Sequence, residues 1–148
     1  MTTTPRNLAA HVASGDALDV RQFRVQERMS SLFEITLVVL SENPNIDFDA
    51  VVGNAASFRL DSGTVTTWTG ICKHIEQIAV EERGLSTYEV TLVPTLWLAT
   101  QRRNHRMFQQ MSELEIVKKL LGEWGIATEL RISGVRRTTR LSRLAMIA

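Results

Sequence analysis

The sequence has very little cysteine and no long hydrophobic run. Its single cysteine, Cys72, excludes an internal disulfide and a metal site built from several cysteines. This usage is typical of proteins that fold in a reducing compartment. No window approaches the roughly 20 apolar residues of a membrane span, and no apolar stretch of signal-peptide length follows Met1. We therefore expect cytoplasmic synthesis without a signal peptide, so that any export uses another route.

Proline and glycine are also scarce, with 3 Pro and 8 Gly among 148 residues. The composition is 44% hydrophobic and 22% charged, which is far from that of disordered or collagen-like chains. A chain of this length buries roughly two thirds of its unfolded surface on folding. The composition therefore predicts a globular protein with a core of its own.

The sequence has almost no net charge, but its charges are segregated. Residues 1–98 carry 7 Lys and Arg against 12 Asp and Glu, whereas residues 99–148 carry 10 against 4. The first part therefore has a charge of −5 and the second a charge of +6. Such segregation favours either contacts between copies of the chain or a basic face for nucleic acid, and composition does not decide between them.

Residues suited to catalysis are few. His11, His74 and His105 lie far apart without metal-binding spacing, and the sequence has no nucleophile elbow, phosphate-binding glycine loop or CxxC motif. Cys72 is expected to be a small buried residue rather than a nucleophile. We therefore predict no catalytic residues, no cofactor-binding residues and no metal ligands.

Three acidic residues, Glu42, Asp47 and Asp49, surround a predicted turn and helix start. Carboxylates at such a place accept backbone hydrogen bonds and interact favourably with the helix dipole. A glycosidase would need two carboxylates across a sugar cleft, and the sequence gives no sign of one. Capping is the favoured interpretation.

Alternating apolar residues predict an antiparallel, β-dominated α+β domain with short helices. The expected strands are 18–25 with a bulge, 33–40, 56–60, 64–80 and 88–92, with a hairpin turn at 61–63. Burial on both faces is expected toward the end of the 33–40 strand. Asp47 is expected to cap a short helix that Gly53 ends.

After Pro94 the pattern becomes more helical. A helical turn is expected around Trp97, followed by a short extended piece at 107–108. Ser112 and Glu115 form a capping box before an apolar helical stripe. Alternation over 126–132 predicts a final strand.

The most conspicuous polar feature is a basic run that contains Arg102, Arg103 and Arg106, close to Phe108. It could neutralise phosphates beside an aromatic platform, as nucleic-acid sites do. We favour a solvated loop or a protein-contact surface, because the chain is nearly neutral overall. Trp97, like the other two tryptophans, is expected to anchor a core or an interface.

Short motifs follow one another along the chain. In the first part they are residues 20–23 (VRQF), 27–30 (ERMS), 32–35 (LFEI), 58–60 (FRL) and 68–71 (WTGI). In the second part they are residues 88–98 (YEVTLVPTLWL), 102–109 (RRNHRMFQ) and 112–117 (SELEIV). In order and spacing these motifs resemble the amino-terminal part of the valine-glycine repeat (VgrG) spike family.

This resemblance implies a barrel-like tube domain of the phage tail-hub type over residues 18–132, after a flexible segment at 1–17. It implies a structural role at the base of a type VI secretion spike or phage-like tail, made in the bacterial cytoplasm and delivered by the machine. Expected partners are two further copies in a homotrimer, the hexameric tube protein of the haemolysin-coregulated type and baseplate proteins. Candidate interface residues are Trp97, Arg102, Arg103, Arg106 and Phe108.

The arginine-rich residues 133–148 depart from the family pattern and are interpreted as a divergent tail or the start of a second domain. The chain could be a fragment, a divergent short hub or a truncated product. Two other readings of its function stay open at this point: a basic nucleic-acid-binding module, and part of a spike whose hydrolase domain lies elsewhere.

Overall fold

The computed structural model describes residues 7–80, 84–103, 105–129 and 145–147. The chain divides into two compact units, residues 1–95 and 96–148. The sequence pattern had suggested one unit over 18–132, with no division near residue 95. Each unit is described by itself below.

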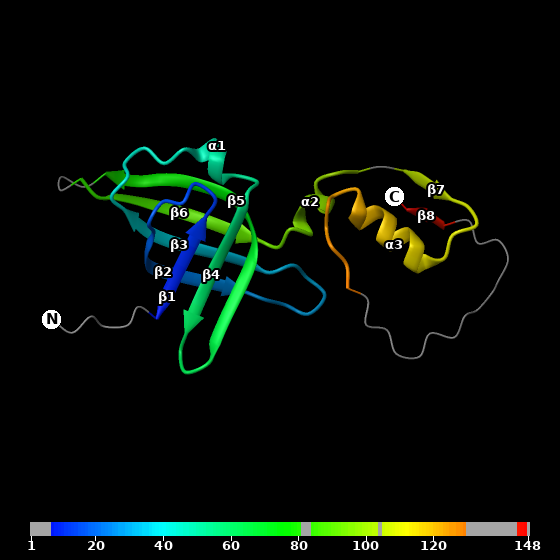
Figure 1. The fold of residues 1–148 in the computed structure, drawn as a ribbon, viewed down its shortest axis with the longest axis horizontal. Helices are drawn as coiled ribbons and strands as arrows, with labels where there is room; N and C mark the ends of the chain where they lie inside the picture. Colours follow the sequence, from blue (N-terminus) through cyan, green and yellow to red (C-terminus); the bar gives the residue numbers. More distant parts are fainter. Residues whose placement is uncertain (1–6, 81–83, 104, 130–144, 148) are drawn as a thin grey trace. The chain divides into compact units, whose positions relative to one another are not determined.

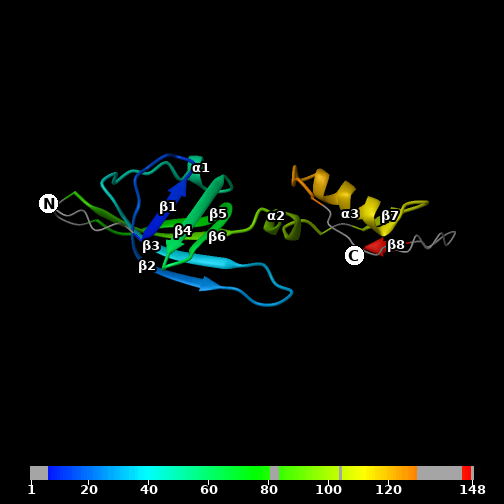
Figure 2. The same cartoon turned by 60° about the horizontal axis from the view of Figure 1, so that its bottom comes forward.

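The first unit is one antiparallel sheet with the strand order β1-β4-β5-β6-β3-β2 (Figure 1). Its elements are β1 (Leu8–Val12), β2 (Asp19–Gln26), β3 (Glu34–Ser41), α1 (Phe48–Val51), β4 (Ala55–Asp61), β5 (Val65–Val80) and β6 (Ser86–Val93). A bridge between Ala10 and Leu18 brings β1 to the start of β2, so the two outermost strands meet. Figure 2 shows β1 and β4 lying over β2 and β3 as the sheet curls back. The expected antiparallel, barrel-like fold is confirmed.

The core lies inside this curl and is densest along β3. Ile35, Leu37 and Val39 are completely buried on one face, as their alternation predicted. On the other face of β3, the residues from Glu34 to Leu40 are only half-buried, so β3 is not fully buried on both faces. The expectation of two-sided burial was wrong, because no second layer of the first unit covers that face among the described elements.

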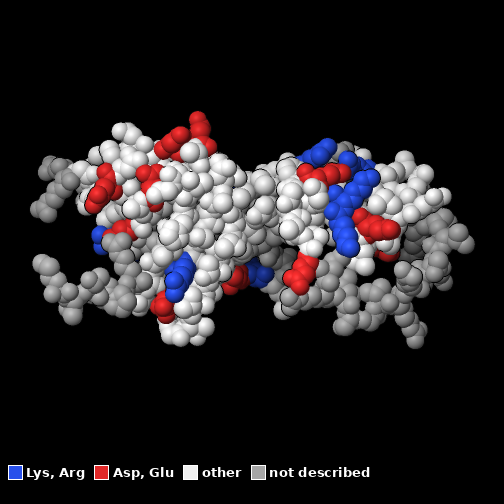
Figure 3. Space-filling view, viewed as in Figure 1, with Lys and Arg blue, Asp and Glu red and all other residues white. Residues whose placement is uncertain are grey.

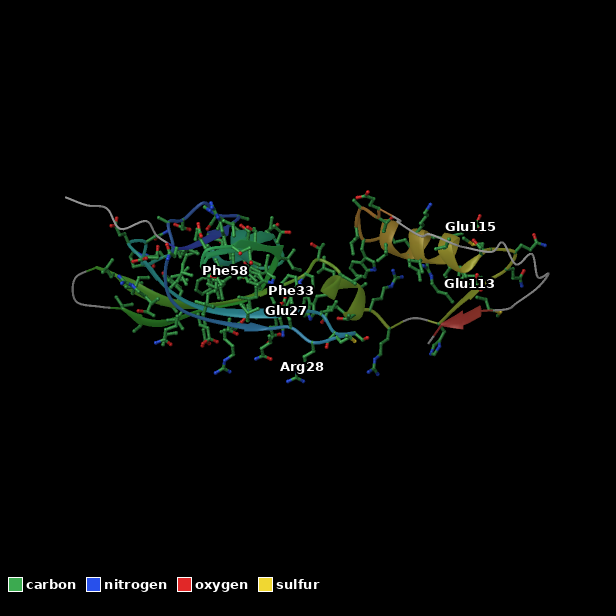
Figure 4. The ribbon with its side chains drawn as sticks, turned by 90° about the horizontal axis from the view of Figure 1, so that it is seen from below. Glu27, Arg28, Phe33, Phe58, Glu113 and Glu115 are labelled. Atoms are coloured by element: carbon green, nitrogen blue, oxygen red, sulfur yellow. The ribbon has the colours of Figure 1, made fainter. Side chains whose placement is uncertain are left out.

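Aromatic side chains fill one end of the curl. Phe58 is fully buried and stacks on Trp68 with ring centroids 5.7 Å apart, and the Phe23 ring is tilted against Phe58 with centroids 5.3 Å apart. The Trp68 indole N–H donates a hydrogen bond of 2.7 Å to a Glu27 carboxylate oxygen. Figure 4 shows Phe58 pointing inside the curl and Arg28 pointing away from it. This hydrogen bond ties the β2–β3 hairpin to β5.

Two local features that the sequence predicted are present. The bulge in β2 lies between Val20 and Gln22, and it returns Phe23 to the inner face. The Asp47 side chain caps α1 by accepting from the Asp49 and Ala50 N–H groups at 3.0 and 3.3 Å. These features rest on local chemistry, which is why a sequence pattern reveals them.

The second unit contains α2 (Trp97–Thr100), β7 (Arg106–Phe108), α3 (Glu113–Gly122) and β8 (Ala145–Ile147), which pairs with β7. The helical turn at Trp97 and the extended piece at 107–108 are both confirmed. The capping box is also confirmed, since Ser112 Oγ accepts from the Glu115 N–H while the Glu115 carboxylate accepts from the Ser112 N–H.

Two expectations about strands were wrong. Residues 8–12, placed in a flexible segment, form β1, because they pair with β4 along their whole length. Residues 126–129 form no strand, because the Ile126 N–H donates to the Leu121 carbonyl at 3.1 Å and folds the chain back on α3. The remainder of that expected strand and most of the 133–148 tail lie outside the described residues.

Gly70 lies where β5 passes closest to the end of β6. A Cβ atom there would overlap the backbone carbonyl of Val93, which cannot move without shifting β6. Gly70→Ala should therefore destabilise the first unit by about 1–3 kcal/mol, measured by urea unfolding. Gly122→Ala, with no atom within 4 Å of the added methyl, is the matched control and should be neutral or slightly stabilising. Equal stabilities of the two variants would contradict this account of the close approach.

Candidate interaction surface

The five residues singled out from the sequence all lie in the second unit, on α2, β7 and the loop between them. Their surroundings differ strongly. Arg102 and Arg103 are exposed, Arg106 and Trp97 are half-buried, and Phe108 is buried. The basic run is therefore not one continuous exposed surface.

Arg106 is held within its own unit by Glu123, which follows α3. Its Nη1 atom donates to both Glu123 carboxylate oxygens, at 2.6 and 2.7 Å. This hydrogen bond, followed by weaker attraction from Arg106, Arg102 and Lys119, lowers the pKa of the Glu123 carboxyl below its ordinary value. The contact fixes β7 against the end of α3, so Arg106 has a structural role inside the unit.

Phe108 packs into the same unit and is only 6% exposed. The Lys119 ammonium lies 5.9 Å from the centre of its ring, within cation–π range. A buried ring cannot stack on a base, so the aromatic platform considered from the sequence is not available. Met107, which lies between Arg106 and Phe108 in β7, is 66% exposed and points to the opposite face of the strand.

Beside the basic run lies a hollow of about 160 Å³. Its lining is Ala99, Arg102, Arg106, Leu120, Leu121, Glu123 and Trp124. The apolar stripe of α3 and Trp124 were both visible in the sequence, but nothing there brought them to Arg102. Figure 3 shows Lys and Arg side chains gathered on this unit, next to a carboxylate group. The hollow therefore combines an apolar floor with a basic rim.

The residues considered for catalysis are placed as ordinary structural groups. Cys72 is completely buried, and this burial raises the pKa of its thiol to about 11, so the reactive thiolate is disfavoured. His74 lies 3.5 Å from Glu76 on the exposed part of β5. Within the described ranges, no three His, Cys, Asp or Glu side chains gather as they would around a metal ion.

The described helices include none that is both long and apolar enough to cross a membrane.

The longest of them, α3, has ten residues and carries charged side chains along its length. Its first turn holds Glu115, whose pKa is lowered because the Ser112 backbone N–H donates to the carboxylate. The charges of α3 therefore serve its cap and its solvated face.

Comparison with protein families gives a match over most of the chain. The model of the phage tail baseplate hub (GPD) family matches residues 26–143. This range begins at the last residue of β2 and contains β3, α1, β4, β5 and β6 of the first unit and α2, β7 and α3 of the second. The match therefore includes most of both units.

Curated proteins similar to this chain include spike proteins of type VI secretion. The VgrG1a spike protein of Pseudomonas aeruginosa is 30% identical over 114 residues, which are 76% of this chain and 18% of that protein. The actin cross-linking toxin VgrG1 of Vibrio cholerae is 28% identical over 151 aligned residues, covering 93% of this chain and 14% of the toxin. The chain thus spans less than a fifth of the length of these relatives.

One solved structure has the same fold. It is the E. coli c3393 protein, described as a component of the type VI secretion system with structural similarity to the T4 bacteriophage tail proteins gp27 and gp5. The match has a TM-score of 0.70 at 20% identity and covers 93% of this chain and 37% of the other. The curled antiparallel sheet is therefore a tail-protein fold.

The Arg106–Glu123 contact should make the stability of the second unit depend on pH. Because the folded pKa of Glu123 is lowered, the contact stabilises the second unit above the ordinary carboxyl pKa and loses this effect as the pH falls through the folded value. Arg106→Met should raise the Glu123 pKa toward its ordinary value, as followed by NMR titration of the carboxyl carbon. Arg103→Met removes a neighbouring charge but no contact to Glu123, so it should leave the titration unchanged. An unaltered Glu123 pKa in Arg106→Met would refute the assignment.

Proposed function

Because the chain belongs to the phage tail baseplate hub (GPD) family, we propose that it is a structural component of a contractile injection machine. Its place is the hub at the base of the spike, in a type VI secretion system or a related phage-like tail, where it joins spike to tube. The observation that carries this proposal is the curled six-stranded antiparallel sheet, together with the family match that runs through it.

A mechanical role agrees with how the sheet is built. Strands β5, β6 and β3 are neighbours in the sheet, and the inner faces of β3 and β6 are almost completely buried. A hub must transmit load without changing shape, and close-packed cores deform little. The tube wall in this proposal is formed by the first unit, which includes the strand β1 and ends at residue 95, before the end of the expected 18–132 tube domain.

The proposed partners are further copies of the hub in a homotrimer, the hexameric tube protein of the haemolysin-coregulated type, and baseplate proteins. A threefold ring closes on itself and can present a matching face to a sixfold ring. Arg102 and Arg103 are the exposed members of the candidate interface. Arg106 and Phe108 support that surface from within, and Trp97 is half-buried in α2.

The proposed role involves no catalysis and no cofactor. The support is that the charged side chains with altered pKa values are a helix cap and an ion pair, Glu115 and Glu123. A machine component is also expected to be made in the cytoplasm and carried out of the cell by the machine. Nucleic-acid binding is disfavoured because Arg106 is neutralised by Glu123 and Phe108 is buried.

The proposal is tested by binding to the tube protein. The purified chain is mixed with hexameric tube-protein rings and analysed by sedimentation velocity at several salt concentrations. The chain should sediment with the rings. Arg103→Glu should weaken this binding about tenfold at low salt, because a rim charge acts through screened long-range attraction.

The matched control is Arg103→Lys, which keeps the charge and should bind like the unchanged chain. A chain that never sediments with the rings would overturn the proposed hub function. Salt-dependent retardation of DNA or RNA at comparable concentrations, without ring binding, would favour the nucleic-acid alternative instead.

A further inference from the structure

The hollow in the second unit has the composition of a docking site for a protein segment. Leu120, Leu121 and Trp124 are each half-buried, so they keep apolar surface open to solvent. Its volume of about 160 Å³ is close to that of engineered apolar cavities that hold a benzene ring. A single large apolar side chain would fill it.

The rim of the hollow has an excess of positive charge. Arg106 is neutralised by Glu123, but Arg102 forms no salt bridge with any residue of the described segments. Lys119 adds a second positive charge near Glu123. One carboxylate therefore faces three cations, and a docking segment should bring at least one further carboxylate.

The first unit of the chain carries a segment of that chemistry. Between Arg28 and Arg59 there is no Lys, Arg or His, and the stretch contains four carboxylates. One of these, Glu34, is bound to Lys73 at 2.7 Å. The other three are exposed and lie in residues 42–52, the acidic segment.

The acidic segment also offers apolar surface. Phe48 at the start of α1 is 38% exposed and Val52 just after α1 is 44% exposed. Asp47 and Asp49 flank Phe48 in the sequence, and Glu42 lies earlier in the same segment. Figure 3 shows carboxylates over α1 on the surface of the first unit. Apolar side chains flanked by carboxylates are the counterpart of an apolar hollow with a basic rim.

We propose that the hollow is a docking site for a second copy of this chain, which inserts the acidic segment with Phe48 toward Trp124 and a carboxylate toward Arg102. Each copy then has one hollow and one acidic segment, so the contact is head-to-tail and can build a ring. This inference deepens the proposed function, because it rests on self-association of the hub.

The test measures the mass of the full chain in solution by sedimentation equilibrium over a range of concentrations, at low and high salt. The unchanged chain should self-associate, more strongly at low salt. Arg102→Glu should weaken self-association about tenfold or more, and Glu42→Lys with Asp49→Lys should do the same. The second variant keeps Asp47, so the cap of α1 is intact. Lys118→Glu, an exposed charge change on α3 outside the hollow, is the control and should associate normally.

Mixing the two variants separates a specific contact from general loss of folding. The Arg102→Glu chain keeps its acidic segment, and the Glu42→Lys, Asp49→Lys chain keeps its hollow. Each should be monomeric alone, whereas the mixture should associate. A mixture that stays monomeric would overturn the inference, as would a monomeric unchanged chain or a Lys118→Glu chain weakened as much as Arg102→Glu. If tube-ring binding persists in any of these cases, the proposed hub function stands while the docking inference falls.

Discussion

The constraint on which the first unit depends is the burial of one face of a six-stranded sheet by the sheet itself. A flat antiparallel sheet of this length would leave Ile35, Leu37 and Val39 open to water on its inner face. Curling removes that surface, and it brings β1 to the start of β2 through the bridge between Ala10 and Leu18. The same curvature covers part of the two edge strands, β1 and β2, whose exposed edges would otherwise be prone to aggregate.

The irregularities of the sheet serve this curl. Bulges in β2 and β5 add twist and keep large side chains directed inward on strands that are too bent for regular pairing. Gly70 leaves room for the Val93 carbonyl where β5 lies beside the end of β6. The stack of Phe58 on Trp68, secured by Glu27, then fills the end that the strands leave open. Packing and this hydrogen bond close the end of the curl, and the one cysteine of the sheet, Cys72, is free.

The sequence predicted what local chemistry determines. The alternation of apolar residues predicted β3, and capping side chains predicted the starts of α1 and α3. It failed where partners distant in sequence decide the outcome: β1 has two adjacent alanines and a weak pattern, and only its pairing with β4 makes it a strand. The positions of the candidate interface residues also depend on such distant partners. Arg106 and Phe108 share one side of β7, and that side faces α3, a fact that no spacing in the sequence reveals.

Local capping and contacts between distant residues together determine the arrangement of charge. Capping and the turn before α1 concentrate carboxylates at one corner of the first unit, with no base between Arg28 and Arg59 to neutralise them. In the second unit Glu123 neutralises one arginine of the basic run and leaves Arg102 beside an apolar hollow. Neither unit can satisfy its own excess charge within the described residues. Complementary surfaces of this kind are where specificity of assembly can reside, because charge steers the encounter and the apolar contact holds it.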